Sequence, residues 1–153
     1  MKTRTILAAL VCSLVSLALY AADPNLGTWK LNESKSKLAA SGAKNTTVVY
    51  AAAGDSVKIT VDGVDGAGKT MHSEWTGKYD GKDYPVTGDA ASDTRSYTKV
   101  DANTLSFVGK KGGKTVFTGK VVVAADGKSR TVTGEGQDAN GKSLSSTSVY
   151  DKK

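Results

Sequence analysis

Residues 68–82 read GKTMHSEWTGKYDGK and combine two features that predict the fold. Between the flanking Gly-Lys pairs, Met71, Trp75 and Tyr79 share one parity, whereas polar residues occupy most of the other. Such alternation is typical of a strand with one buried face and one face in water. Glycine tolerates the positive φ that tight hairpin turns require. The stretch therefore predicts an antiparallel strand bounded by turns, with an aromatic inner face.

The same pattern recurs along the chain, with Gly-Lys pairs at 68–69, 81–82, 113–114, 127–128 and 141–142. Ten strands are predicted, near residues 27–32, 46–53, 56–62, 69–79, 82–87, 93–100, 103–110, 114–124, 128–136 and 143–151. Every connection except that across 33–45 is of hairpin length, and that one has room for a short helical turn within 33–40. A long meander leaves exposed edges unless it closes. We therefore predict an all-β, up-and-down antiparallel β-barrel of about ten strands, wide enough to leave interior space, with a β-sandwich as the alternative.

The first 22 residues differ from the rest of the chain. Lys2 and Arg4 precede an apolar run over 6–19 that small residues follow, which is the pattern of a secretory signal. The apolar run is short for a membrane-spanning helix. We predict a signal peptide over 1–22, a single barrel domain over 23–153, no membrane span, and a periplasmic or secreted protein.

Composition excludes several classes of function. The chain of 153 residues has one His and one Cys, too few for a zinc site. Its 21 Lys and Arg exceed its 15 Asp and Glu, giving a net charge of +6, but the lysines are spread singly along the strands. Nucleic-acid binding requires a clustered basic patch. We predict a monomer with no metal, no cofactor and no nucleic-acid partner.

Both ends of the predicted barrel resemble the calycin superfamily. The Gly-Thr-Trp-Lys-Leu string of 27–31 and the Val-Tyr-Asp-Lys string of 149–152 are similar to the ends of fatty-acid-binding proteins. The chain also resembles small bacterial exported proteins of lipocalin-like type. The resemblance implies a ligand-binding barrel in which Gly27 and Trp29 are structural residues at the base and Tyr150 takes part in ligand binding.

Two departures from that resemblance concern arginine. Fatty-acid-binding proteins carry Arg two residues before the last Tyr, where this chain has Ser148, and lipocalins pack an Arg of the last strand on the Trp, whereas 143–151 contains none. Arg95, which shares parity with Tyr97, and Arg130 are the arginines of the predicted domain. Facing inward, either side chain could hold an anionic head group. Alternatively, Arg130 lies in solvent at a rim beside its turn.

The predicted function is an exported, non-enzymatic barrel that holds a small hydrophobic or amphipathic molecule, because aromatic walls with few polar groups build such sites. The predicted ligand-binding residues are Met71, Trp75, Tyr79, Arg95, Tyr97, Arg130 and Tyr150.

The alternative is a protein-interaction or inhibitor module with a filled interior and a protruding loop at 33–45 or 88–93. His72 with Glu74 could form a general-base pair, but both take the polar parity and no nucleophile motif accompanies them, so we expect no enzyme.

Overall fold

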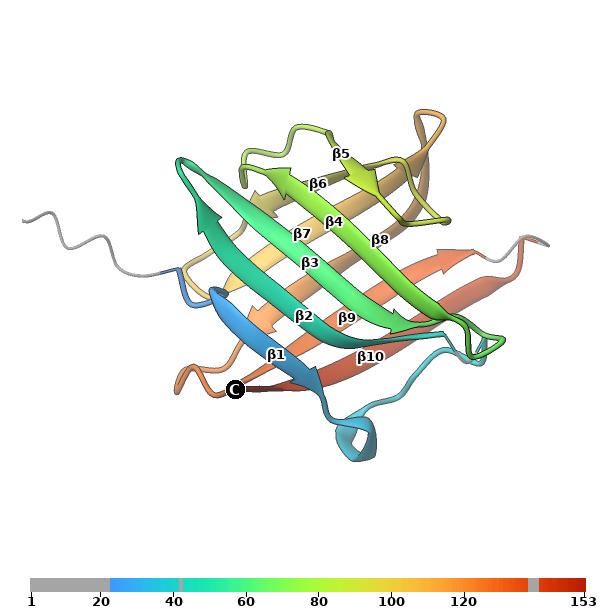
Figure 1. Ribbon diagram of the computed structural model, residues 1–153, viewed down its shortest axis with the longest axis horizontal. Helices are drawn as coiled ribbons and strands as arrows, with labels where there is room; N and C mark the ends of the chain where they lie inside the picture. The colour runs from blue at the N-terminus through green and yellow to red at the C-terminus, as the bar shows by residue number, and fades with distance from the viewer. Residues whose placement is uncertain (1–22, 42, 138–140) are drawn as a thin grey trace, which may run out of the picture.

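Ten strands follow one another through the part of the chain that the computed structural model describes, residues 23–41, 43–137 and 141–153 (Figure 1). They are β1 (Gly27–Leu31), β2 (Lys44–Ala53), β3 (Ser56–Val64), β4 (Thr70–Gly77), β5 (Tyr84–Thr87), β6 (Thr94–Lys99), β7 (Thr104–Lys111), β8 (Lys114–Val123), β9 (Ser129–Gln137) and β10 (Ser143–Lys152). The predicted signal peptide over 1–22 lies outside the described residues. Within those ranges no helix is long and apolar enough to cross a membrane.

Pairing of the first strand with the last closes the sheet. Every neighbouring pair is antiparallel, and β1 joins β10 with Trp29 opposite Lys152 and Leu31 opposite Tyr150. The predicted up-and-down barrel is therefore confirmed, and the sandwich alternative is wrong. Each predicted strand agrees with the observed one within two residues at either end.

The connections match the turn chemistry of the sequence. The glycines of all five Gly-Lys pairs have positive φ, from 69° at Gly127 to 81° at Gly68. The helical turn expected within 33–40 is the 3-10 helix η1 (Glu33–Lys35). The connection from β4 to β5 is longer than predicted, because Asp80 organises it: its carboxylate accepts hydrogen bonds from the Lys82 N–H and the Tyr84 hydroxyl.

The barrel has two distinct ends (Figure 1). At the base, on the left of the figure, β1 begins, β10 ends, and β2 turns into β3. Trp29 is fully buried there, and its Nε1 donates a hydrogen bond to the carbonyl of Asn25 at 2.7 Å. Gly27 has a φ of 121°, a conformation that favours glycine. The opposite end, which we call the mouth, carries the connection from β1 to β2 and the turn from β3 to β4.

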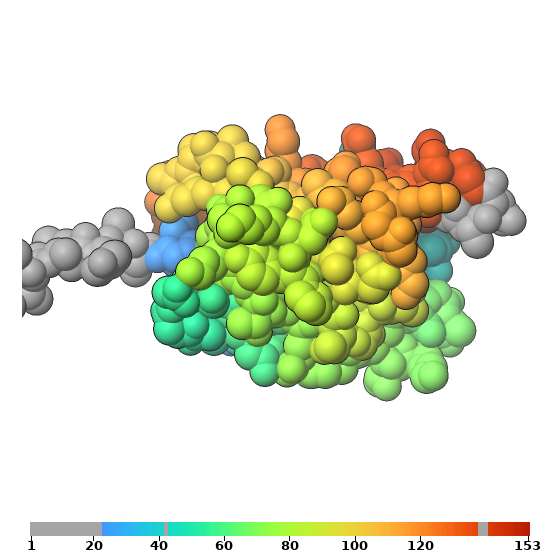
Figure 2. Space-filling model, turned by 90° about the horizontal axis from the view of Figure 1, so that it is seen from above, coloured from blue at the N-terminus to red at the C-terminus, as the bar shows by residue number. Residues whose placement is uncertain are grey.

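β5 is the most weakly paired strand of the wall. Two residue pairs join it to β4 and two join it to β6, whereas β2 and β3 share nine. Pro85 has no N–H to donate, which limits the ladder on this strand. Side chains nevertheless cover this side of the barrel, where the space-filling view shows a continuous surface from yellow-green to orange (Figure 2).

Glycines and phenylalanines alternate across the inner wall of β7, β8 and β9. Phe107 lies opposite Gly119, and Phe117 lies opposite Gly109. A Cβ at Gly119 would lie closer to the Phe107 ring and to the Thr133 carbonyl oxygen than van der Waals contact permits. The two rings therefore lie over positions that have no side chain, which leaves the middle of the barrel open.

Gly119→Ala should destabilise the barrel, because the added methyl group meets the backbone of β9, which cannot move freely. We expect a loss of about 1–3 kcal/mol in the free energy of unfolding, measured by urea denaturation. Gly134→Ala is the matched control: Gly134 is the cross-strand partner of Gly119, and its added Cβ would meet only the Ser146 Oγ at 3.5 Å. Equal losses in both variants would contradict this account of the wall.

Candidate functional site

A cavity of about 690 Å³ runs through the barrel interior toward the mouth. Most of its lining is apolar and includes Val48, Ile59, Val61, Phe107, Phe117 and Val132. Residues of the mouth, among them Ala39, Asp89 and Ala91, also line it. A cavity of this size and composition is typical of small-molecule sites. The side chains therefore do not fill the barrel.

The structure brings five of the seven predicted ligand-binding residues to this cavity. They are Met71, Arg95, Tyr97, Arg130 and Tyr150. Trp75 and Tyr79 are not part of its lining. The parity of these two residues predicts that they face the interior. It does not predict whether other side chains cover them and so separate them from the cavity.

Trp75 and Tyr79 belong to the packed part of the interior. The Trp75 ring lies edge-on to Tyr97, with 4.8 Å between ring centroids, and its Nε1 donates to the Arg95 carbonyl at 2.8 Å. Tyr79 also packs on Tyr97, at 6.2 Å between centroids. Burial raises the pKa of the Tyr79 hydroxyl well above its ordinary value. These two rings support the cavity wall at Tyr97 rather than forming it.

Arg130 lies under three aromatic rings at the base. Its guanidinium carbon lies 4.7 Å from the ring centroid of Trp29, 4.6 Å from that of Tyr50 and 5.2 Å from that of Tyr150. The residue is 2% exposed, so it does not lie in solvent at a rim. Cation–π contacts are strongest when both groups are desolvated, as they are here. The arginine that packs on Trp29 is thus Arg130 of β9, whereas the resemblance to lipocalins implied an arginine of the last strand.

The hydrogen-bonding capacity of Arg130 is not used up by this packing. Its Nε and Nη1 atoms are buried, and in the part of the chain that the structure describes neither has a hydrogen-bond partner. A buried charge without an acceptor is unfavourable. Because Arg130 also lines the cavity, its planar set of N–H donors suits a carboxylate, sulfate or phosphate group at the base.

Arg95 is in a different state. Its Nη2 donates to Asp89 Oδ2 at 2.6 Å, and the two side chains are only 14% and 16% exposed. Its guanidinium also lies 5.2 Å from the Phe117 ring centroid. Burial acts to lower the pKa of Arg95, but Tyr97 and Asp89 outweigh burial and raise it, which keeps the side chain charged. Arg95 therefore already holds an anionic partner from its own chain.

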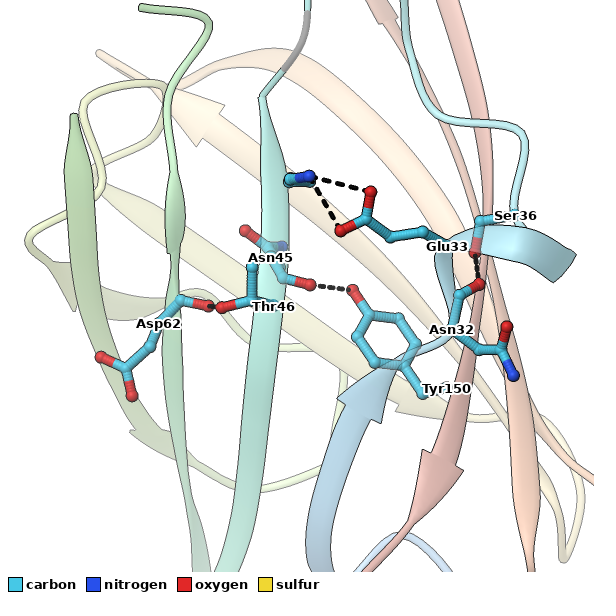
Figure 3. Close-up of polar contacts among 8 residues, drawn as sticks. Asn32, Glu33, Ser36, Asn45, Thr46, Asp62 and Tyr150 are labelled. Carbon is cyan, nitrogen blue, oxygen red and sulfur yellow. Dashed lines mark hydrogen bonds and ion pairs between the residues drawn. The ribbon is translucent and has the colours of Figure 1, made fainter. Parts of the chain in front are cut away.

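Tyr150 presents its ring to the cavity but uses its hydroxyl elsewhere. The hydroxyl donates a hydrogen bond to the carbonyl of Asn45 at 3.0 Å (Figure 3). Asn45 lies at an irregularity in the pairing of β2 with β3. Burial raises the pKa of Tyr150, and the nearby Arg130 acts in the opposite direction. Tyr150 thus links β10 to β2 and stacks on Arg130. Its hydroxyl, the group that would bind a ligand, already donates its hydrogen bond to Asn45.

The connection between β1 and β2 is held at the mouth by polar contacts (Figure 3). Lys44 Nζ donates to both carboxylate oxygens of Glu33, at 2.8 and 2.9 Å. Ser36 Oγ donates to the carbonyl of Asn32 at 2.7 Å. Ala39 of this connection lines the cavity, so these contacts define one side of its opening.

Sequence reasoning missed Tyr50, Phe117 and Asp89 as residues of the site. The parity of Tyr50 with Val48, and of Phe117 with Val121, was a usable signal, since all four side chains line the cavity. Asp89 had no such signal. It follows Gly88 in a segment that predicts only a turn.

His72 lies outside the barrel and does not line the cavity. It is 58% exposed, and its Nδ1 lies 2.6 Å from Asp62 Oδ1, whereas its Nε2 lies 3.7 Å from Glu74. The closer partner is therefore Asp62, directly opposite on β3.

Among the described residues, no group of three or more His, Cys, Asp and Glu side chains could hold a metal ion.

No protein-family model matches the chain, and no curated protein matches it in sequence. The fold is similar to that of EF1p2_mFAP2b bound to DFHBI, with a TM-score of 0.52, 11% identity, and coverage of 87% of this chain and 97% of that chain. A redesigned beta barrel, mFAP1, bound to DFHBI, has a TM-score of 0.48, 12% identity, and coverage of 86% and 98%. At this identity the first likeness shows the fold alone. The chain is a closed antiparallel β-barrel with an internal cavity.

The pH dependence of stability should report the contact between His72 and Asp62. The hydrogen bond that His72 donates to the Asp62 carboxylate raises the pKa of His72 above its ordinary value of about 6.5, so the charged form is stabilised by folding. That contribution is complete below about pH 6.5 and is lost as pH rises through the folded-state pKa. The difference in unfolding free energy between the wild type and His72→Gln should therefore shrink from about pH 6 to pH 9. If urea titrations give the same difference in unfolding free energy from pH 6 to pH 9, the predicted role of the contact between His72 and Asp62 is wrong.

Proposed function

We propose that this chain is an exported, non-enzymatic barrel that binds a small amphipathic molecule, with the anionic head group of the ligand at Arg130. The observation that carries the proposal is a buried guanidinium, two of whose nitrogens have no hydrogen-bond partner among the described residues, beside a largely apolar cavity. The signal-like pattern over 1–22 supports export. The packing of Arg130 on Trp29 resembles the Trp–Arg contact of lipocalins, which supports assigning this chain to the lipocalin-like barrels.

The apolar lining would hold the tail of the ligand. Each methylene group that moves from water into such a wall contributes about 0.8 kcal/mol. Phe107 and Phe117 supply the broadest apolar surfaces, and the Met71 side chain adds a flexible one near the mouth. EF1p2_mFAP2b, a protein of similar fold, is bound to DFHBI, which supports ligand binding by a barrel of this kind.

The head group would complete the hydrogen bonding of Arg130. In the low-dielectric interior a charge-assisted hydrogen bond is stronger than it is in water. The electrostatic influence of Arg130 also reaches Tyr50, where it opposes the rise in the pKa of the hydroxyl that burial causes. The base of the cavity is thus a positive site enclosed by aromatic rings.

The alternative, an inhibitor module with a filled barrel, is less well supported. The cavity of about 690 Å³ argues against a filled interior. The candidate loop at 88–93 turns Asp89 and Ser92 inward, since both side chains are largely buried. The exposed position of His72, away from the cavity, supports a non-enzymatic role.

The test uses two probes that share a ten-carbon tail, decyl sulfate and decanol, below the concentrations at which they form micelles. Arg130→Met keeps an unbranched apolar stem at this position but removes the charge and the donors of the guanidinium, together with its contacts with the rings. We expect it to weaken decyl sulfate binding at least about tenfold in calorimetric titrations and to change decanol binding by less than about threefold.

Lys152→Met is the matched control. Lys152 Nζ lies 5.0 Å from the ring centroid of Trp29, so the control removes a positive charge from the same ring without touching the cavity. Both probes should bind this variant as they bind the wild type. Failure of either probe to bind the wild type, or equal sulfate affinity in Arg130→Met and wild type, would sink the proposal.

A further inference from the structure

The cavity wall carries a carboxylate as well as its two arginines. Asp89, in the connection from β5 to β6, lines the cavity and pairs with Arg95. Three donors hold it: the Arg95 guanidinium and the Ser92 hydroxyl reach Oδ2, each at 2.6 Å, and the Ala91 N–H reaches Oδ1 at 2.8 Å. Ser92 is itself fully buried, so this is a fixed arrangement and not a surface ion pair.

The backbone before Asp89 fixes the position of the carboxylate. Gly88 has a φ of 75° and packs so closely on the carbonyl of His72 in β4 that a Cβ would overlap the oxygen. Any other residue at this position would be strained and would push the loop away. The close packing on β4 therefore holds the carboxylate against the inner wall, facing Arg95.

This placement sets the charge balance of the interior. Two guanidinium groups and one carboxylate leave one uncompensated positive charge, and it belongs to Arg130. Glu135 also contributes to the lining, but it is exposed at the mouth, where water and salt screen its charge. A single negative charge on a ligand would balance Arg130. A second one would lie in a low-dielectric space with Arg95 already engaged and Asp89 repelling it.

We propose that Asp89 is a specificity-determining residue that restricts the cavity to ligands with one negative charge. It acts as a built-in anion that occupies Arg95, so that among the described lining residues only the Arg130 guanidinium is left for the charge of a ligand. This inference rests on the proposed function, since it concerns the charge of the ligand that the same cavity binds.

The experiment compares two head groups of similar shape, decyl sulfate and decyl phosphate, at about pH 8, where the sulfate carries one charge and the phosphate close to two. The wild type should prefer the sulfate by at least about tenfold in calorimetric titrations. Asp89→Asn keeps an oxygen that can accept hydrogen bonds but removes the charge, which frees Arg95 for the ligand. It should lower that preference at least about tenfold, through tighter phosphate binding.

Two further variants locate the effect. Asp83→Asn removes the same charge from a carboxylate that pairs with Lys110 at 2.7 Å and does not line the cavity, so the preference should stay within about twofold of wild type. Adding Arg95→Gln to Asp89→Asn should abolish the gain in phosphate binding, because that gain is made through the freed guanidinium. Decanol affinity reports whether the cavity is intact in each variant.

The outcomes separate this inference from the function on which it rests. If the wild type binds decyl sulfate but Asp89→Asn shows an unchanged preference, Asp89 does not set the charge of the ligand, and the proposed function stands. An equal shift in Asp83→Asn would assign the effect to overall charge and would overturn the inference in the same way. If the wild type fails to bind decyl sulfate or decanol, the proposed function itself fails and the inference fails with it.

Discussion

The stack of Arg130 under Trp29, Tyr50 and Tyr150 is the interaction on which the rest of the structure depends. These four side chains come from β9, β1, β2 and β10, the strands around the point where the barrel closes. The contacts with the three rings offset part of the desolvation of the cation. The same packing leaves Nε and Nη1 of Arg130 without hydrogen-bond partners in the described part of the chain. One residue therefore both packs against the strands that close the barrel and gives the base of its cavity a positive charge.

The two arginines of the interior show how environment decides the role of a side chain. Both guanidinium groups lie near aromatic rings and both line the cavity. Arg95 lies near a loop that supplies Asp89, so its charge is balanced within the protein. Arg130 lies at the base, where its neighbours are rings, and no ion pair with a carboxylate is found for it among the described residues. The interior is consequently polarised along the axis of the barrel, with an ion pair toward the mouth and a free cation at the base.

Local sequence patterns were sufficient for the strands but not for the site. Period-two alternation and Gly-Lys turns predict each strand because both depend on neighbours in the chain. Parity likewise predicted that Tyr97 and Arg95 share one strand face, and both line the cavity. It could not separate Trp75 from Met71, which share a strand face, because the rings that cover Trp75 come from other strands. The role of Arg130 depends on pairings among β1, β9 and β10, and that of Asp89 on a loop folding inward; neither is encoded in a short stretch of sequence.

Closure between the first and last strands also constrains how the chain can fold. Trp29 and Lys152 pair although more than a hundred residues separate them, so the ring of strands is completed by its most distant contact. Folding rates fall as contacts become less local. Until β10 arrives, β1 and β9 present unpaired edges that can join other chains. Docking of β10 therefore both removes these edges and adds the Tyr150 ring to the cover of the Arg130 charge, so a barrel without this pairing is the form most exposed to aggregation.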